Sequence, residues 1–397
     1  MKILTFSTLF PNAEKPGHGI FVETRLRHLV ASGQVEARVV APVAWFPSSH
    51  PRFGSYAKQA RVPRHETRHG LQVAHPRYPV LPKVGMNLAP LLLAQAVKPA
   101  IARLIDEGYD FDLIDAHYFY PDGVAAAMLA RHFNKPLVIT ARGSDITLLP
   151  QYPLPRRMIR WAARRADAVI TVCNALRDEV VALGVDADRV TSLRNGVDLE
   201  LFQPVERAAD ATFTLLTVGH LVPVKAQELI IGALPLLPGV RLVVAGDGPN
   251  RGMLENLARE LKVDGRVSFL GAVPQAQLRE HYGRADALVL ASSREGWANV
   301  LLESMACGTP VVASRVYGTP EVVAAPEAGV LMAERSPRGV ADAVNALRAA
   351  YPDRAATRRY AEGFSWDDTS TGQLRIFDAI LTRTQPQRAR IFAHTSL

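Results

Sequence analysis

Two glutamates, Glu295 and Glu303, have residue types and a spacing suited to binding one ligand that carries hydroxyl groups. Seven residues separate them, and the segment that holds them, residues 287–313, reads ALVLASSREGWANVLLESMACGTPVVA. Glu295 is expected in a loop and Glu303 one turn into the following helix, where side chains lean toward the helix N-terminus. Both carboxylates are therefore predicted to reach the same ligand.

The backbone between the two glutamates predicts an anion site. A helix is expected to begin near Asn299, a suitable N-cap residue. The N–H groups of Asn299, Val300 and Leu301 would then be unpaired at the positive end of the helix dipole, which favours an anion by roughly 0.3 to 1 kcal/mol. A phosphate flanked by hydroxyl groups matches this combination of amides and carboxylates. The ordinary alternative is that Glu303 is a solvated helix residue and Glu295 a polar loop tip.

The elements that must position these groups come from the same segment. Residues 287–291 and 311–313 are apolar runs of the kind that parallel sheets bury on both faces. Ligands of open parallel sheets bind at the carboxyl ends of the strands. The loop at 292–298 is therefore expected to face the ligand.

The rest of the chain repeats this alternation of strand and helix. A length of 397 residues favours two domains. Helices are expected between the strands, for example at 20–32 and 122–132. The alternation predicts an α/β fold with doubly wound parallel sheets. The expected strands are at 3–10, 37–41, 71–75, 113–116, 137–140, 168–172, 189–193, 213–218, 241–245, 267–270, 287–290 and 310–313.

Turn and linker signals divide the chain near residue 205. Asn195-Gly196 is a turn signal, and the polar tract at 204–211 is typical of a linker. Residues 46–83 are rich in bases and prolines and are expected to form an insertion or a long loop. The predicted parts are an N-terminal domain at 1–205, a C-terminal domain at 206–365 and a C-terminal segment at 366–397. The last residues of that segment, 384–397, are expected to be frayed.

Two glycine-containing turns follow strands in the second half. The first, G-H-L-V-P-V-K, places Gly219 and His220 before Lys225, which is expected to head a helix that runs to residue 237. A lysine there can bind a diphosphate as a point charge. The second turn, G-D-G-P-N-R-G, begins at Gly246, but Arg251 occupies the third glycine position of the dinucleotide motif G-x-G-x-x-G. That motif is therefore not met.

In the first half, polar residues follow two expected strands. His117 follows the strand at 113–116, and Arg142 and Asp145 follow the next one, so all three are candidates to face a ligand. The alternatives are a structural histidine and an Asx turn at Asp145.

The loop after the first strand ends in P-G-H-G-I-F and leads into a helix. Gly17 and Gly19 would let the backbone approach a ligand closely. An ordinary glycine-containing turn is the alternative.

Composition describes a globular protein with a basic balance. Apolar residues make up 48% and charged residues 21%, which is ordinary for globular proteins. The 46 basic and 38 acidic residues give a formal charge of +8, which suits an anionic ligand, nucleic acid or an anionic membrane surface. The segment 156–165, RRMIRWAARR, predicts a basic amphipathic helix that lies on a membrane or is an ordinary outer helix.

Cysteine usage and hydropathy point to the cytoplasm. Cys173 and Cys307 lack metal-ligand spacing and are expected to be reduced core residues. The start, MKILTFSTLF, is expected to be a first strand, because Pro11 and Asn12 follow where a leader would have its cleavage site. We find no run of eighteen or more apolar residues, so no membrane span is predicted. Peripheral contact with the inner membrane face stays open.

Several motifs together resemble a known family. The stretch R-E-G-W-A-N-V-L-L-E-S-M-A-C-G-T-P-V-V-A resembles the E-x7-E signature of the family 4 retaining glycosyltransferases, which have the GT-B fold. The turn G-H-L-V-P-V-K resembles their G-R-L-x-x-x-K-G, with His220 in place of arginine and Ala226 in place of glycine. The resemblance covers nearly the whole chain and is strongest over 213–325.

This resemblance implies two Rossmann-like domains facing across a cleft, with a C-terminal helix crossing back to the first. It implies retaining transfer of a sugar from a nucleoside diphosphate sugar to a glycan or lipid-linked acceptor, in cell-surface polysaccharide synthesis, with no metal, no cofactor and no nucleic acid partner. His117, Glu295 and Lys225 would be catalytic. The donor would contact Gly19, Gly219, His220, Gly246, Asn299, Val300, Leu301 and Glu303, and the acceptor Gly17, Arg142 and Asp145.

Within these roles, Glu303 would bind ribose hydroxyls and Glu295 the donor sugar. Lys225 and the helix amides would stabilise the leaving diphosphate electrostatically. Two other functions remain as alternatives. A glycan phosphorylase of the same fold would need a lysine for a pyridoxal cofactor, and a non-catalytic nucleotide or nucleic acid binder would be indifferent to both glutamates.

Overall fold

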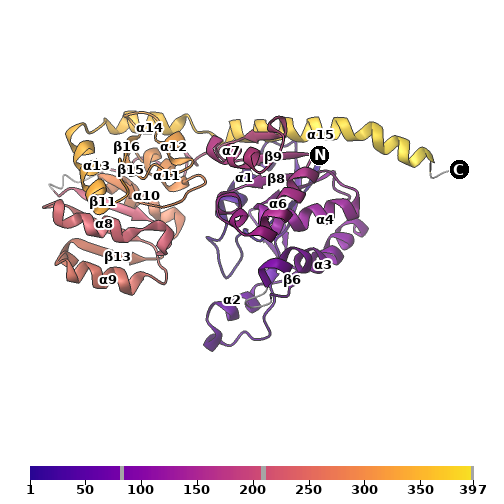
Figure 1. The fold of residues 1–397 in the computed structure, drawn as a ribbon, viewed down its shortest axis with the longest axis horizontal. Helices are drawn as coiled ribbons and strands as arrows, with labels where there is room; N and C mark the ends of the chain where they lie inside the picture. Colours follow the sequence, from indigo (N-terminus) through magenta and orange to yellow (C-terminus); the bar gives the residue numbers. More distant parts are fainter. Residues whose placement is uncertain (81–84, 207–211, 395–397) are drawn as a thin grey trace. The chain divides into compact units, whose positions relative to one another are not determined.

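The computed structural model describes residues 1–80, 85–206 and 212–394. The chain divides into two compact units, of which the first is coloured indigo to magenta with the yellow α15, and the second pink to orange, in Figure 1. The first unit contains Met1–Leu193 and Asp367–Leu397, and the second contains Arg194–Trp366. The predicted boundary was residue 205, and the predicted linker at 204–211 extends into 207–211, which lie outside the described residues.

The first unit is built on an eight-stranded sheet with the order β10-β9-β8-β7-β1-β2-β5-β4. All neighbours are parallel except β4, which runs antiparallel to β5 at one edge. A separate parallel pair joins β3 to β6. The strands are β1 (Lys2–Phe6), β2 (Glu36–Val40), β3 (Val43–Ala44), β4 (His65–Arg68), β5 (Leu71–Ala74), β6 (Arg77–Tyr78), β7 (Leu113–His117), β8 (Leu137–Ala141), β9 (Ala168–Thr171) and β10 (Val190–Ser192).

Helices cover both faces of this sheet. In Figure 1, α15 lies above the sheet and α3 and α4 lie below it. Leu26 of α1 and Phe377 of α15 share a core with Ile3 and Leu113 of the sheet. The helices of this unit are α1 (Ile20–Ala31), α2 (Ser55–Arg61), α3 (Gly85–Asp106), α4 (Val124–Phe133), α5 (Ser144–Thr147), α6 (Pro153–Arg165), α7 (Asn174–Ala182) and α15 (Trp366–His394).

Two expectations for this unit were wrong. The insertion or long loop expected at 46–83 holds α2 and the β4–β5 hairpin, of which only the strand at 71–75 was predicted. Residues 81–83 lie outside the described residues. The hairpin turns at His69-Gly70, both with positive φ, so a histidine stands where asparagine would have signalled the turn. The tail expected to fray from residue 384 continues α15 to His394; only 395–397 lie outside the described residues.

Helix α3 was not found by the search for a continuous apolar run. Its 22 residues are long and apolar enough, by length and composition, to cross a membrane. Lys98 and the prolines Pro90 and Pro99 interrupt the run, but its mean hydropathy is still 1.4. Within the first unit, α3 packs on α4 and β6 and buries Leu93 and Val97. It is therefore built into this unit as a packing helix.

The second unit has a six-stranded parallel sheet with the order β13-β12-β11-β14-β15-β16. The strands are β11 (Thr214–Val218), β12 (Arg241–Ala245), β13 (Val267–Gly271), β14 (Ala287–Leu290), β15 (Val311–Ala313) and β16 (Gly329–Leu331). The helices are α8 (Gln227–Ala233), α9 (Arg251–Glu260), α10 (Gln275–Arg284), α11 (Asn299–Ala306), α12 (Thr319–Val322), α13 (Pro337–Ala349) and α14 (Arg354–Glu362).

The strand order of the second unit reverses beside β11. From β11 the chain adds β12 and β13 on one side, then returns to place β14 on the other. The loops after β11 and β14 therefore diverge to opposite faces of the sheet. Such a switch point is where open α/β sheets bind their ligands.

Candidate functional site at the strand ends

The predicted catalytic lysine and loop glutamate meet at this switch point. Lys225 ends a 3-10 turn, η5 (Pro223–Lys225), in the loop after β11. Glu295 lies in the loop after β14, and its Oε1 is 2.6 Å from Lys225 Nζ. The two side chains are 25% and 11% exposed, so the pair is partly shielded from water but still reachable by a ligand. The arrangement offers one cation and one carboxylate at a single point.

The helix after Lys225 differs from the expectation. Lys225 precedes the α-helix, α8 begins at Gln227, and a 3-10 turn replaces the helix after Ala233. Between them, Ala226 adopts left-handed backbone angles, φ 51° and ψ 43°. This conformation favours glycine, which explains why the family pattern has glycine at the position that Ala226 occupies.

The start of α11 forms an amide-lined end with no side-chain cap. Ala298 is the N-cap residue and Asn299 the first helical residue, so the expected asparagine cap was wrong. Leu301 N–H was expected to be free, but it donates to Ala298 O at 3.0 Å. Its contribution to an anion site is therefore removed. Asn299 and Val300 have no backbone acceptor for their N–H groups within the described part of the chain.

Glu303 is buried and held by α10. Its Oε2 accepts from Tyr282 Oη at 2.7 Å and its Oε1 from Gln275 Nε2 at 3.0 Å. Burial raises the pKa of the Glu303 carboxyl, and these two hydrogen bonds oppose the rise. Gln275 itself is half-buried. Glu303 is thus a preorganised acceptor and is not a solvated helix residue.

The glycine turns at the ends of β11 and β12 pack against each other. A Cβ on Gly246 would lie 1.9 Å from Gly219 O, so no side chain fits there. Gly246 N–H donates to Gly271 O at 2.8 Å. Backbone packing therefore accounts for Gly246, and its predicted contact with the donor stays a prediction. A Cβ on Gly219 would meet only Lys225 side-chain atoms, at 3.8 Å or more.

His220 replaces the arginine of the family pattern and points to its neighbouring turn. Its Nδ1 lies 2.7 Å from Asp247 O, which can only accept, so Nδ1 carries a proton. The residue is exposed, which leaves the other edge of the ring toward solvent. Its predicted contact with the donor stays a prediction.

In the first unit, His117 and Arg142 come together in a buried pair. Arg142 Nη2 lies 2.7 Å from His117 Nδ1, and His117 Nε2 lies 3.2 Å from Asp115 Oδ2. Burial lowers the pKa of His117 to about 4, with the Arg142 charge lowering it further and Asp115 opposing this. The histidine is therefore neutral at pH 7. Both of its ring nitrogens are engaged by side chains of the first unit.

Asp145 and Asp122 shape the loops around this pair. Both oxygens of Asp145 accept backbone N–H groups, from Phe119, Arg142 and Gly143. These donors precede Asp145 in the chain, so the bonds are not those of an Asx turn, and a direct contact with the acceptor would require Asp145 to exchange them. Asp122 accepts from Thr8 N and Thr8 Oγ1, and burial raises its pKa to about 7.

The two glycines of the first loop have different surroundings. Gly19 is the N-cap residue of α1, with φ 68°, and a Cβ there would lie 2.3 Å from Leu9 O. A Cβ on Gly17 would meet nothing within 4 Å. The left-handed backbone and the close approach of Leu9 thus explain the glycine at position 19, whereas at position 17 the structure has room for a side chain. Their contacts with ligands stay predictions.

Sequence reasoning missed several partners of the site residues. Tyr282 and Gln275 hold Glu303, and Asn195 Nδ2 donates to Asn299 Oδ1 at 3.2 Å. Arg25 and Gln373 belong to the buried group around His117. For Asn195 a turn signal was present in the sequence. The others are ordinary helix residues whose importance depends on contacts far along the chain.

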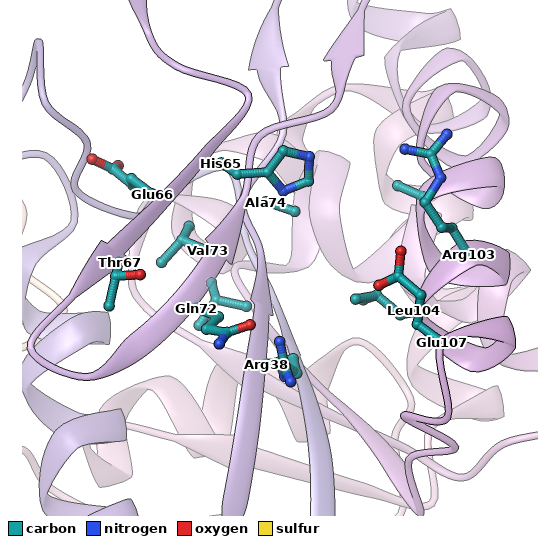
Figure 2. A pocket seen from close by; sticks show the side chains of 12 residues that line it. Arg38, His65, Glu66, Thr67, Gln72, Val73, Ala74, Arg103, Leu104 and Glu107 are labelled. Carbon is teal, nitrogen blue, oxygen red and sulfur yellow. The ribbon is translucent and has the colours of Figure 1, made fainter.

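A separate pocket of about 270 Å³ lies in the first unit, between the sheet and the C-terminal half of α3 (Figure 2). Arg38, Glu66 and Arg103 line it, and it holds none of the predicted site residues. Two of its charged groups are already engaged. Glu66 pairs with His75 at 2.7 Å, and the Arg38 guanidinium lies 5.2 Å from the Tyr109 ring centre. The pocket is therefore distinct from the strand ends that carry the candidate site.

Comparisons with known proteins agree with these features. The profile of Glycosyltransferase Family 4 matches residues 17–201, and that of Glycosyl transferases group 1 matches residues 200–364. A D-inositol 3-phosphate glycosyltransferase of Mycobacteroides abscessus is 32% identical over 313 residues, which cover 72% of this chain and 70% of that protein. The chain belongs to the group 1, family 4 glycosyltransferases. The expected family is confirmed.

Solved structures show the fold of this glycosyltransferase. Sucrose-phosphate synthase from Thermosynechococcus elongatus matches with a TM-score of 0.74 and 20% identity over 99% of both chains. Anabaena HepE in complex with UDP-glucose matches with a TM-score of 0.69 and 20% identity, covering 96% of this chain and 100% of that chain. These neighbours have the GT-B fold, so the predicted α/β class with two doubly wound domains is confirmed.

Proposed function

We propose that this glycosyltransferase moves a sugar from a nucleoside diphosphate sugar to an acceptor hydroxyl with retention of anomeric configuration. The observation that carries the proposal is the Lys225–Glu295 pair, 2.6 Å apart, at the switch point of the second sheet. On donor binding, Lys225 would exchange the carboxylate for the diphosphate and leave Glu295 for sugar hydroxyls. A fixed cation at the developing charge of the leaving group stabilises the transition state.

The donor site would extend from this pair to Glu303. The first-turn N–H groups of α11, at Asn299 and Val300, would donate hydrogen bonds to the diphosphate at the positive end of the helix dipole. Glu303 Oε1 would then accept from the ribose hydroxyls in competition with Gln275. UDP and UDP-glucose are bound in solved structures of HepE, so uridine sugars head the panel of donors.

We propose two alternative classes of acceptor. The family resemblance favours a glycan or lipid-linked acceptor of cell-surface polysaccharide synthesis. Relatives from Mycobacteroides abscessus and Mycobacterium tuberculosis, 32% and 31% identical, are D-inositol 3-phosphate glycosyltransferases, which favours a small phosphorylated polyol as the second class. An acceptor screen with purified donor and both classes distinguishes them, since only the true acceptor yields a new glycoside.

Contact with an anionic membrane would suit a lipid-linked acceptor. The five arginines of α6 are all exposed, and Tyr152 and Leu154 at its start are 46% and 40% exposed. Exposed Met86 and Leu88 begin α3, which packs beside η2 (Phe119–Gly123), as α6 also does. Arginines beside exposed apolar side chains are the composition of membrane-surface helices. Co-sedimentation with phosphatidylglycerol vesicles, but not with phosphatidylcholine vesicles, is the expected result.

Calorimetry with a panel of nucleoside diphosphate sugars tests the donor site. Glu303→Gln keeps the shape of the side chain but removes its charge, and we expect donor affinity to fall roughly 10- to 100-fold, the loss of a hydrogen bond to a charged group. Glu280→Gln, at an exposed glutamate of α10 in the same unit, is the matched control and should bind like the native chain. If no donor binds the native chain, or both variants bind equally, the proposed site is wrong.

A further inference from the structure

The sheet of the first unit changes character along the face that α1 and α15 cover. Toward the amino ends of β7 and β8 this face carries Leu113 and Val138, which join the core with both helices. Two residues farther along each strand it carries Asp115 and Thr140, both buried. Side chains of a strand alternate between faces, so His117 lies on this same face as Asp115. A polar group is therefore buried under the two helices, beside the end of β7.

A directed chain of hydrogen bonds connects α15 to His117 through this group. Arg25 Nε of α1 donates to Gln373 Oε1 at 2.8 Å, and Gln373 Nε2 donates to Asp115 Oδ2 at 3.0 Å. The same Asp115 oxygen is 3.2 Å from His117 Nε2, and Arg142 Nη2 is 2.7 Å from His117 Nδ1. Arg25 and Gln373 are each 1% exposed.

The two arginines set the direction of every bond in this chain. Arginine can only donate, so His117 Nδ1 must be an acceptor and the ring proton lies on Nε2, facing Asp115. At the other end, Arg25 makes Gln373 Oε1 an acceptor, which turns its NH₂ group toward Asp115. Glutamine is suited to this position because it must accept on one side and donate on the other. Leucine could do neither, and glutamate could not donate.

We propose that Gln373 of α15 is a positioning residue for the glycosyl transfer, holding His117 through Asp115 in one orientation and one tautomer. The inference rests on the proposed function together with the catalytic role that the family resemblance implies for His117. It adds that the C-terminal helix, 256 positions beyond His117 in the chain, contributes to the chemistry of the first unit. A histidine held by a carboxylate keeps one tautomer and one ring orientation. A ligand contact at a ring nitrogen would replace the bond to Asp115 or to Arg142.

The charged groups that face His117 predict how loss of Gln373 changes it. They are Asp115 of β7, Arg142 after β8 and Arg25 of α1. Without the Gln373 amide, the Asp115 carboxylate has one donor fewer and interacts more strongly with His117. The pKa of His117 would rise from about 4, and the acid limb of the pH–rate profile would move to higher pH.

The first measurement is nitrogen NMR of histidine-labelled protein, which does not depend on activity. In the native chain, His117 should show the neutral form protonated on Nε2. Both Gln373→Leu and Gln373→Glu should shift its ring-nitrogen signals. Phe377→Leu, which removes packing from the same helix without touching the hydrogen-bond chain, should leave them unchanged. Unchanged signals in both Gln373 variants would overturn the inference.

The second measurement is kinetics with the donor and acceptor found by screening. Gln373→Leu should lower kcat roughly 10- to 100-fold with little change in donor KM, since a small misplacement near the reacting groups has effects of that size. In a His117→Gln background, Gln373→Leu should cause no further loss, because the glutamine acts through the histidine.

The outcomes distinguish the catalytic role of His117 from the positioning role of Gln373. An inactive His117→Gln beside a fully active Gln373→Leu would overturn the inference alone. Full activity of His117→Gln would remove His117 from the proposed function and overturn the inference with it. An equal loss of activity in Phe377→Leu and Gln373→Leu, with identical pH–rate profiles, would mean that α15 acts only by packing.

Discussion

At the scale of single residues, close backbone packing makes a prediction at Gly246. An added methyl group would overlap Gly219 O, so the turns after β11 and β12 must separate. We expect Gly246→Ala to lower the free energy of unfolding by about 1 to 3 kcal/mol, the usual range for overpacking, and to weaken donor binding. Gly252→Ala is the matched control, because a Cβ there meets nothing within 4 Å inside α9. It should raise stability by roughly 0.5 to 1 kcal/mol.

Urea unfolding of both glycine variants, followed by circular dichroism, measures these changes. Equal stabilities of the two variants would show that the turns have room that the structure does not indicate. A loss of stability in Gly246→Ala without any loss of donor affinity would place Gly246 in the scaffold only.

Asp122 makes a prediction about pH. Its pKa in the folded chain is raised to about 7 by burial, above the value of about 4 expected when unfolded. The folded state then retains a proton that the unfolded state releases, so the free energy of unfolding falls as pH rises from about 4 to 7. The slope from this one group is at most about 1.4 kcal/mol for each pH unit.

Asp122→Asn removes this titration. Relative to the native chain, the variant should therefore gain stability as pH rises from 5 to 8, measured by urea unfolding at both pH values. Asp378→Asn, at an exposed position of α15, should show no such gain. Parallel curves for the native chain and Asp122→Asn would mean that the hydrogen bonds from Thr8 keep the carboxylate ionised.

At the scale of elements, the uncapped start of α11 makes a prediction about function. Ala298 occupies the N-cap position without a side-chain hydrogen bond. Ala298→Ser would supply an oxygen for the first-turn amides and should raise stability by about 1 kcal/mol. The same oxygen would compete with the diphosphate, so we expect UDP affinity to fall. Calorimetry and thermal unfolding give the two quantities, and an unchanged UDP affinity would argue against an anion site at α11.

Helix α15 shows what an element contributes beyond its own pattern. Its apolar residues Leu374, Phe377 and Ile380 predicted an amphipathic helix, and all three are buried in the core of the first unit. Gln373 lies next to them in sequence and carries no signal of its own. Its contacts with Arg25 and Asp115 arise only because α15 and α1 share one face of the sheet.

At the scale of the whole molecule, the two units have separate cores, which predicts that a ligand of one unit stabilises mainly that unit. The proposed donor groups Lys225, Glu295 and Glu303 all lie in the second unit. A ligand that binds only the folded state at 100 times its dissociation constant stabilises that state by about 2.7 kcal/mol. UDP should therefore protect amides of the second unit from hydrogen exchange at strands such as β11 and β14. Protection confined to the first unit would contradict the proposed donor site.

The sequence by itself determined the class of fold and the segments that carry chemistry. Local signals were enough for this, because apolar periodicity and turn residues depend on neighbours only. The strands from 241–245 and 287–290 and the E-x7-E segment were predicted from such patterns, and the family was confirmed. The strand β4 of the β4–β5 hairpin and the full length of α15 were missed where the local signal was weak.

Tertiary structure alone decided which of these segments meet. The reversal of strand order beside β11 brings Lys225 to Glu295, 70 positions apart, and no local pattern encodes a strand order. It also showed that Leu301 is bonded, that Glu303 is held by Tyr282, and that His117 is neutral between Asp115 and Arg142. Burial and pairing create these properties, and both exist only once distant parts of the chain have packed together.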